Sequence, residues 1–213
     1  MNPLRCIFLL LFATTTALGQ LVQKSNPPSA PEEPSAVVRS LYNEVVARHP
    51  VGIPKDADMK AFAPYLSKSL LHRIDLAHAC EDDYYRQHQN PNLKPQIEWL
   101  EFGLFSGGME NAGPRGFHIL ETEPEKNGSF RVVVELFIIF GMPTNPDPSV
   151  WHVAAIVVRE DGKFVVNDVI FLKDYSTLEP EFRLSETLAS GCNGSRWVGR
   201  RKQSDDKRDK PKQ

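Results

Sequence analysis

The sequence predicts an α+β domain in which N-terminal helices pack on a curved antiparallel β-sheet and a short helix follows near the C-terminus. Apolar residues recur at helical spacing before residue 90. After residue 96 the chain contains runs rich in β-branched and aromatic residues, which are typical of strands. Short turn clusters separate these runs, so the strands are expected to form a meander that the preceding helices cover.

Three helical segments are predicted before the sheet. The first begins at Ser35, a candidate N-terminal cap, and ends before Pro50. A short helical turn is predicted at 58–63, and a longer helix from Ser67 to about His88. The apolar stripe of the longer helix consists of Leu70, Leu71, Ile74 and Ala77.

Strands are predicted at 96–105, 116–122, 129–140, 150–160 and 163–173. Asp161-Gly162 is a two-residue turn between apolar runs and indicates a type I′ hairpin. Residues 177–190 are predicted to form a terminal helix or two short turns, which Gly191 ends.

Composition divides the chain into four segments. Residues 1–19 combine a positive charge at Arg5 with an apolar run and small residues, the pattern of a cleavable signal peptide. Residues 20–35 are a proline-rich linker, 36–198 one domain, and 199–213 a charged, disordered tail. The apolar run is shorter than the roughly 20 residues that span a bilayer. We therefore expect an exported protein, periplasmic or secreted, without a membrane span.

The charge of the chain limits the classes of molecule that it is expected to bind. The chain has 25 basic and 27 acidic residues and a net charge of −2. The tail at 199–213 is basic, so the domain itself is acidic, which argues against nucleic acid as its partner. No His-Glu-x-x-His pattern or glycine-rich phosphate loop occurs in the sequence, and we expect neither a metal nor a cofactor.

Two cysteines remain after the predicted signal peptide, Cys80 and Cys192. In an oxidising compartment they are able to form a disulfide. The alternative is two separate buried thiols, and the spacing alone does not decide between them.

The hairpin supplies one candidate functional residue. With Asp161-Gly162 as the loop, Val157 faces Val166 and Ala155 faces Asp168, which makes Asp168 the single carboxylate on an apolar face. A carboxyl group among hydrocarbon either binds hydrogen-bond donors or has a raised pKa, and both situations occur at functional sites. The structural alternative is a buried aspartate that ties a neighbouring loop through backbone N–H groups.

The longer helix supplies the second candidate. Extension of its apolar stripe brings His78, Glu81, Tyr84, Tyr85 and His88 to the inward side. A histidine and a carboxylate one turn apart are suited to act as base and acid. If the helix instead ends near Glu81, the residues that follow contact water.

The helices, followed by a meander containing Trp151-His152-Val153-Ala154 and the segment from Arg159 to Val169, resemble the nuclear-transport-factor-2-like (cystatin-like) superfamily. Within it, the chain is similar to secreted bacterial members of unknown function. The resemblance covers residues 36–175. It implies a cone whose sheet wraps a long helix, a pocket at the open end, and a homodimer through the sheet as an open alternative. The pocket residues that we expect are Tyr42, Tyr85, Trp151 and Asp168.

These observations predict a non-catalytic module that binds a small molecule or a protein in a pocket between sheet and helix. The alternative is a small acid–base enzyme, similar to an isomerase or dehydratase, that uses Asp168 with His78 or Glu81. Related isomerases of the superfamily use a carboxylic acid in an apolar pocket as a hydrogen-bond donor, which favours Asp168 in that role.

Overall fold

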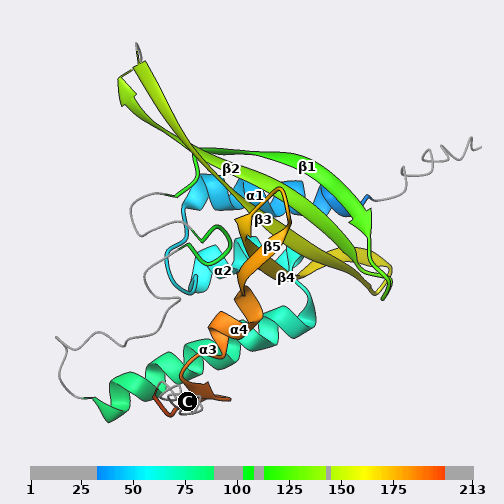
Figure 1. Cartoon of the computed structure of the whole chain (residues 1–213). Helices are drawn as coiled ribbons and strands as arrows, with labels where there is room; N and C mark the ends of the chain where they lie inside the picture. The colour runs from blue at the N-terminus through cyan, green and yellow to red at the C-terminus, as the bar shows by residue number, and fades with distance from the viewer. Residues whose placement is uncertain (1–32, 89–102, 108–112, 143–144, 200–213) are drawn as a thin grey trace, which may run out of the picture. The chain divides into compact units, whose positions relative to one another are not determined.

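A five-stranded antiparallel sheet is the centre of the fold in the computed structural model of the chain (Figure 1). The structure describes residues 33–88, 103–107, 113–142 and 145–199. The strands are adjacent in chain order, β1-β2-β3-β4-β5, so the predicted meander is confirmed. Their bounds are β1 Gly116–Pro124, β2 Phe130–Met142, β3 Asn145–Glu160, β4 Lys163–Asp174 and β5 Glu179–Arg183.

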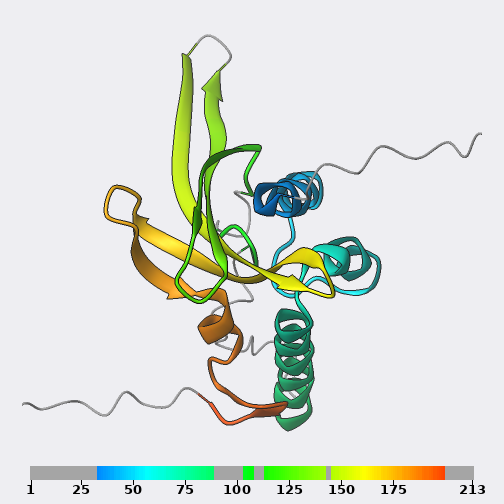
Figure 2. The ribbon, with the colours of Figure 1, turned by 90° about the vertical axis from the view of Figure 1, so that its right-hand side faces the viewer.

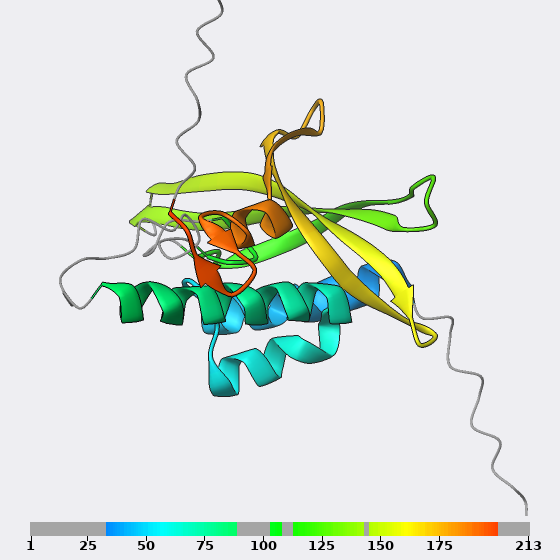
Figure 3. The same ribbon diagram turned by 90° about the horizontal axis from the view of Figure 1, so that it is seen from below.

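The helices that precede the sheet lie together on one side of it (Figure 3). A short helix and a two-stranded hairpin follow the sheet, and the hairpin packs on α3. The α+β class and the short C-terminal helix are therefore confirmed. The elements outside the sheet are α1 Pro34–Arg48, α2 Asp56–Phe62, the 3-10 helix η1 Ala63–Tyr65, α3 Lys68–Gln87, α4 Leu184–Leu188, β6 Cys192–Asn193 and β7 Arg196–Trp197.

The predicted start of α3 at Ser67 agrees with the structure, whereas the predicted start of α1 does not. Ser67 caps α3, because its hydroxyl accepts a hydrogen bond from the backbone N–H of Leu70 at 2.9 Å. The predicted cap at Ser35 is wrong, since α1 begins at Pro34, after Glu33. Proline fits the first helical position because its missing N–H would be unpaired there.

The first and last predicted elements also need correction. Most of the predicted strand at 96–105 lies outside the described residues, and its described end, Gly103–Phe105, forms an isolated bridge and a turn. The C-terminal stretch begins with β5, which pairs with β4, before α4 forms. Phe182 of β5 stacks on Phe171 of β4 with ring centroids 4.5 Å apart. This contact favours a strand at residues where a helix or turns had been predicted.

The two faces of the sheet differ in what they pack against. We call the face toward α1, α2 and α3 the inner face, and the opposite one the outer face. Inner-face side chains join the main core with Leu41 of α1 and Leu70 of α3. These strand residues are Val132, Val134, Leu136, Val153, Ala155, Val157, Phe164, Val166, Val169 and Phe171. A smaller outer cluster contains Val133, Ala154, Ile156 and Ile170.

The Asp161-Gly162 turn has the backbone of the predicted type I′ hairpin, because both residues have positive φ, 49° and 81°. Val157 faces Val166 as expected. Beyond this pair the predicted register is wrong. A β-bulge leaves Asn167 unpaired, and Asp168 then faces Ile156 instead of Ala155. One extra residue reverses the alternation, so Asp168 points to the outer face.

All described elements belong to one compact unit that begins at Glu32. The predicted signal peptide, most of the proline-rich linker and nearly all of the charged tail lie outside the described residues. Within the described part, no helix is both long and apolar enough to cross a membrane.

Candidate functional site

Asp168 is a buried outer-face carboxylate whose hydrogen bonds are made locally. One oxygen accepts the backbone N–H of Val169 at 2.9 Å and that of Ser185 at 3.0 Å. The other accepts the Ser185 hydroxyl at 2.7 Å and lies 3.7 Å from the Arg183 guanidinium. Ser185 is in the first turn of α4, where backbone N–H groups lack intrahelical partners. Asp168 thus ties α4 to β4, as the structural alternative expected.

His78 and Glu81 lie on α3, as predicted, but they make separate contacts. The His78 imidazole is 3.7 Å from the Asp82 carboxylate, one helical turn away. The Glu81 side chain is only 9% exposed and lies 3.6 Å from the Lys55 ammonium. None of the described contacts joins either residue to Asp168.

Tyr42 and Trp151 converge on one short segment, residues 103–107. The Tyr42 hydroxyl donates to the carbonyl of Phe105 at 2.9 Å, and the Trp151 indole N–H donates to that of Ser106 at 2.7 Å. Burial raises the pKa of the Tyr42 hydroxyl. Phe105 is fully buried between sheet and helices, with its ring 5.1 Å from that of Phe62. Two of the residues expected to line a pocket, Tyr42 and Trp151, thus lie beside a segment that carries a buried aromatic core residue.

The four expected pocket residues therefore do not line one site. Tyr42 and Trp151 anchor the 103–107 segment, while Asp168 points to the outer face. Tyr85 is 45% exposed on α3, and partial burial and the nearby Glu81 carboxylate raise its pKa. Asp168 lies apart from the others because the bulge at Asn167 turns it to the outer face. Tyr85 lies apart because its side of α3 is exposed.

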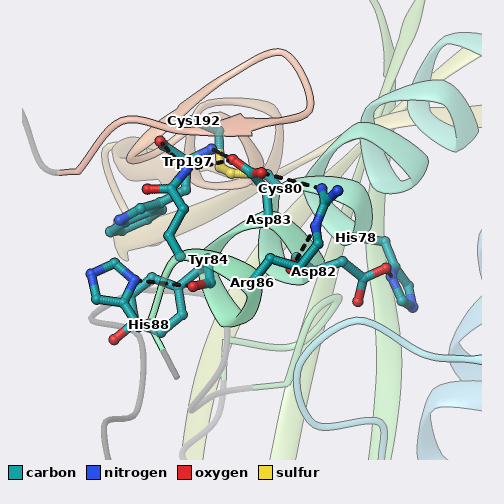
Figure 4. Close-up of polar contacts among 10 residues, drawn as sticks. His78, Cys80, Asp82, Asp83, Tyr84, Arg86, His88, Cys192 and Trp197 are labelled. Carbon is teal, nitrogen blue, oxygen red and sulfur yellow. Dashed lines mark hydrogen bonds and ion pairs between the residues drawn. A yellow bond between two sulfur atoms is a disulfide. The ribbon is translucent and has the colours of Figure 1, made fainter. Parts of the chain in front are cut away.

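Cys80 and Cys192 form a disulfide that fastens the C-terminal hairpin to α3 (Figure 4). The link is reinforced by the Asp83 carboxylate, which accepts the backbone N–H of Trp197 at 2.9 Å. This hydrogen bond is the main reason that the pKa of Asp83 is lowered. The Trp197 ring meets that of Tyr84 edge-on, with centroids 5.2 Å apart. The C-terminal hairpin is therefore held on α3 by a disulfide, a hydrogen bond and an aromatic contact.

A polar cluster on the outer face was not predicted. Glu135 of β2 lies between two histidines: one oxygen is 3.0 Å from His118 Nδ1 and the other 3.5 Å from His152 Nε2. The hydrogen bond with His118 is the main cause that lowers the pKa of Glu135. Tyr175 stacks on His152 with centroids 4.4 Å apart and donates to Glu121 at 2.7 Å, which raises its own pKa. We call these five residues the outer-face cluster.

The outer-face cluster arises from cross-strand pairing. Glu135 is directly opposite His118 on β1 and directly opposite His152 on β3, so the three side chains project from the same face. A charged residue within the apolar β2 run, with a histidine in each flanking strand, is the signal that sequence analysis missed. Among the described residues, no group of three or more metal-ligating side chains is arranged to hold an ion.

Apolar side chains adjoin the outer-face cluster. Phe137 of β2 contacts the His118 ring, with centroids 5.2 Å apart, and is paired with Val150 of β3. Val150 is 47% exposed and Ile139, two residues beyond Phe137, is 57% exposed. The outer face therefore combines ionisable, aromatic and aliphatic groups within three neighbouring strands.

The chain was compared with protein-family models, curated proteins and solved structures. None of them matches it. Its function is therefore inferred from the geometry of its own residues.

Proposed function

We propose that this chain is an exported, non-catalytic binding module whose outer sheet face binds a protein partner. One observation carries the proposal: Glu135 lies between His118 and His152 on the face opposite to α1, α2 and α3, beside the exposed Val150 and Ile139. Protein interfaces characteristically combine apolar and aromatic groups with a few polar groups that fix the orientation of the partner.

Two observations support export. The first 19 residues have the pattern of a signal peptide. The Cys80–Cys192 disulfide is of a kind that persists in oxidising compartments such as the periplasm or the cell exterior.

We also infer that the chain is a member of the nuclear-transport-factor-2-like superfamily. The support is a curved antiparallel meander with α1 and α3 on one side, together with the Asp161-Gly162 hairpin (Figure 2). A homodimer through the sheet, which the resemblance suggests, would use the same outer face.

The acid–base enzyme is the weaker alternative. Its central residue, Asp168, already accepts hydrogen bonds from Val169 and Ser185 on both carboxylate oxygens, so a substrate would have to displace them. The hollow beside Ser185 has a volume of about 100 Å³, whereas pockets for small molecules are commonly about 300 Å³ or more.

Native mass spectrometry of the protein isolated from its own exported fraction tests the proposal. We expect the wild type to carry the mass of an additional, different polypeptide, and His152→Ala to lose it. Glu123→Ala is the matched control, because Glu123 is an exposed carboxylate on β1 outside the outer-face cluster. A wild type that carries no polypeptide other than copies of the chain itself, or a complex with a different polypeptide that survives His152→Ala together with Glu135→Ala, would overturn the proposal.

A further inference from the structure

The hairpin of β2 and β3 extends well beyond the rest of the sheet (Figures 1 and 2). Pairing of β1 with β2 reaches only to Phe137, and pairing of β3 with β4 begins at Val153. Past these points, within the part of the chain that the structure describes, the two strands pair with each other alone, from Ile138 opposite Ser149 to Met142 opposite Asn145. We call residues 138–142 and 145–149 the arm.

The arm has the composition of a segment that gains stability by association. A two-stranded ribbon by itself is only marginally stable in water. From Leu136 to Pro146 the chain has no charged residue, and Ile139 within the arm is 57% exposed. An uncharged, apolar edge strand is a template for pairing with another strand, and proteins usually protect such edges.

The two edges of the arm are protected differently. On β3, Pro146 and Pro148 have no backbone N–H, and prolines two apart remove successive donors from the same side of a strand. Prolines within a ladder are confined to positions whose nitrogen faces away from the paired strand. The edge of β3 that faces away from β2 therefore cannot pair with a further strand.

The β2 edge has no such protection. The carbonyl of Phe137 faces β1, because it accepts the N–H of Arg115 at 2.8 Å. Backbone groups two residues apart along a strand point to the same side, so those of Ile139 and Gly141 also point away from β3. Beyond Phe137, no described strand pairs with this edge. Among the described residues, none pairs its backbone with the outward N–H and C=O groups of this edge.

We propose that the β2 edge of the arm pairs with the same edge of a second copy, antiparallel and about a two-fold axis, to give a continuous intermolecular sheet. A two-fold contact brings each residue against its own counterpart or a near neighbour, so a charged edge would repel itself. The uncharged run from Leu136 to Pro146 avoids that repulsion. Gly141 has no side chain and permits close approach of a second backbone. This inference is independent of the outer-face partner proposed above.

Sedimentation velocity over a range of protein concentrations tests the inference. We expect a monomer–dimer equilibrium in the wild type and an association about tenfold weaker or more in Ile139→Pro, because proline removes an outward N–H once from each copy. Ile139→Lys retains the N–H but places two like charges at the two-fold contact, and it is expected to dissociate the dimer as well. It keeps the test conclusive if the proline variant does not fold.

Val198→Lys is the matched control, because Val198 is a comparably exposed apolar residue that follows β7, outside the five-stranded sheet and its outer face. We expect it to dimerise like the wild type. A monomeric wild type at every concentration would overturn the inference, as would a dimer that both Ile139 variants preserve. A dimer that Val198→Lys dissociates as strongly as Ile139→Lys would show that the edge does not make the contact, which also overturns it.

Discussion

The inner and outer faces of the sheet are built from the same strands but have different contents. On the inner face, alternate residues of β2, β3 and β4 are apolar and join one core with the helices. On the outer face, a small apolar cluster is interrupted by Asp168 and by the outer-face cluster around Glu135. Burial explains the inner-face residues of the main core, whereas the outer face retains ionisable groups that burial alone does not explain. This difference is the reason that we propose the outer face as the binding surface.

The largest effect is expected from the disulfide that holds the C-terminal hairpin on the helical layer. Replacement of Cys80 and Cys192 by serine opens a loop with a sequence separation of 112 residues. Loop-closure entropy predicts a loss of about 4 to 5 kcal/mol in the free energy of unfolding. Urea denaturation of the variant measures this loss, and the wild type in reductant should behave like the variant. Equal urea midpoints for the wild type, the reduced wild type and the variant would show that the disulfide does not stabilise the fold.

A pair of identical substitutions on β3 compares the two faces directly. Val153→Ala removes two methyl groups from a fully buried inner position and should cost about 2 to 3 kcal/mol. Val150→Ala, on the exposed outer face, should change stability by less than about 0.5 kcal/mol. Chemical denaturation of both variants provides the measurement. Comparable losses would mean that the outer face is packed as tightly as the core.

Two of the outer-face carboxylates, Asp168 and Glu135, should separate into a structural residue and one that our proposal assigns to binding. Asp168→Ala leaves the N–H and hydroxyl of Ser185 without their acceptor and should cost about 1 to 3 kcal/mol. Glu135→Ala removes contacts with partly exposed histidines and should cost less than about 1 kcal/mol. Thermal unfolding ranks the two variants. The reverse order would assign Glu135 to the framework of the fold.

A smaller effect is expected in the pH dependence of stability. The pKa of Glu135 is lowered from 4.5, mainly by its hydrogen bond with His118. A carboxylate with a lowered folded-state pKa stabilises the fold above its unfolded pKa, and this contribution is lost as the pH falls through the folded value. The stability difference between wild type and Glu135→Gln should therefore shrink as the pH falls below about 4.5. A pH-independent difference would contradict the described contact.

The sequence contained enough local information to predict most of the framework. Ser67 and the apolar stripe that follows it predicted α3, and Asp161-Gly162 predicted the hairpin, because caps and two-residue turns depend on neighbouring residues. The order of helices and strands was likewise sufficient for the α+β class.

The candidate site was less predictable because it depends on register and on long-range pairing. A bulge such as that at Asn167 has no distinct local signal here, yet it moves Asp168 to the other face. The contact of His118 with Glu135 joins residues 17 apart, and the exact pairing of β1 with β2 includes a further irregularity after Ile119. Periodicity alone does not specify such pairings.

Histidine-directed covalent labelling tests the functional assignment of the outer face most directly. His118 and His152 lie on that face, while His72 and His78 lie on α3. Labelling with diethylpyrocarbonate in the undisturbed exported fraction should modify His118 and His152 less than in the purified protein, with His72 and His78 modified equally in both. Protection of the α3 histidines alone, or equal labelling of all four in the two samples, would contradict the account.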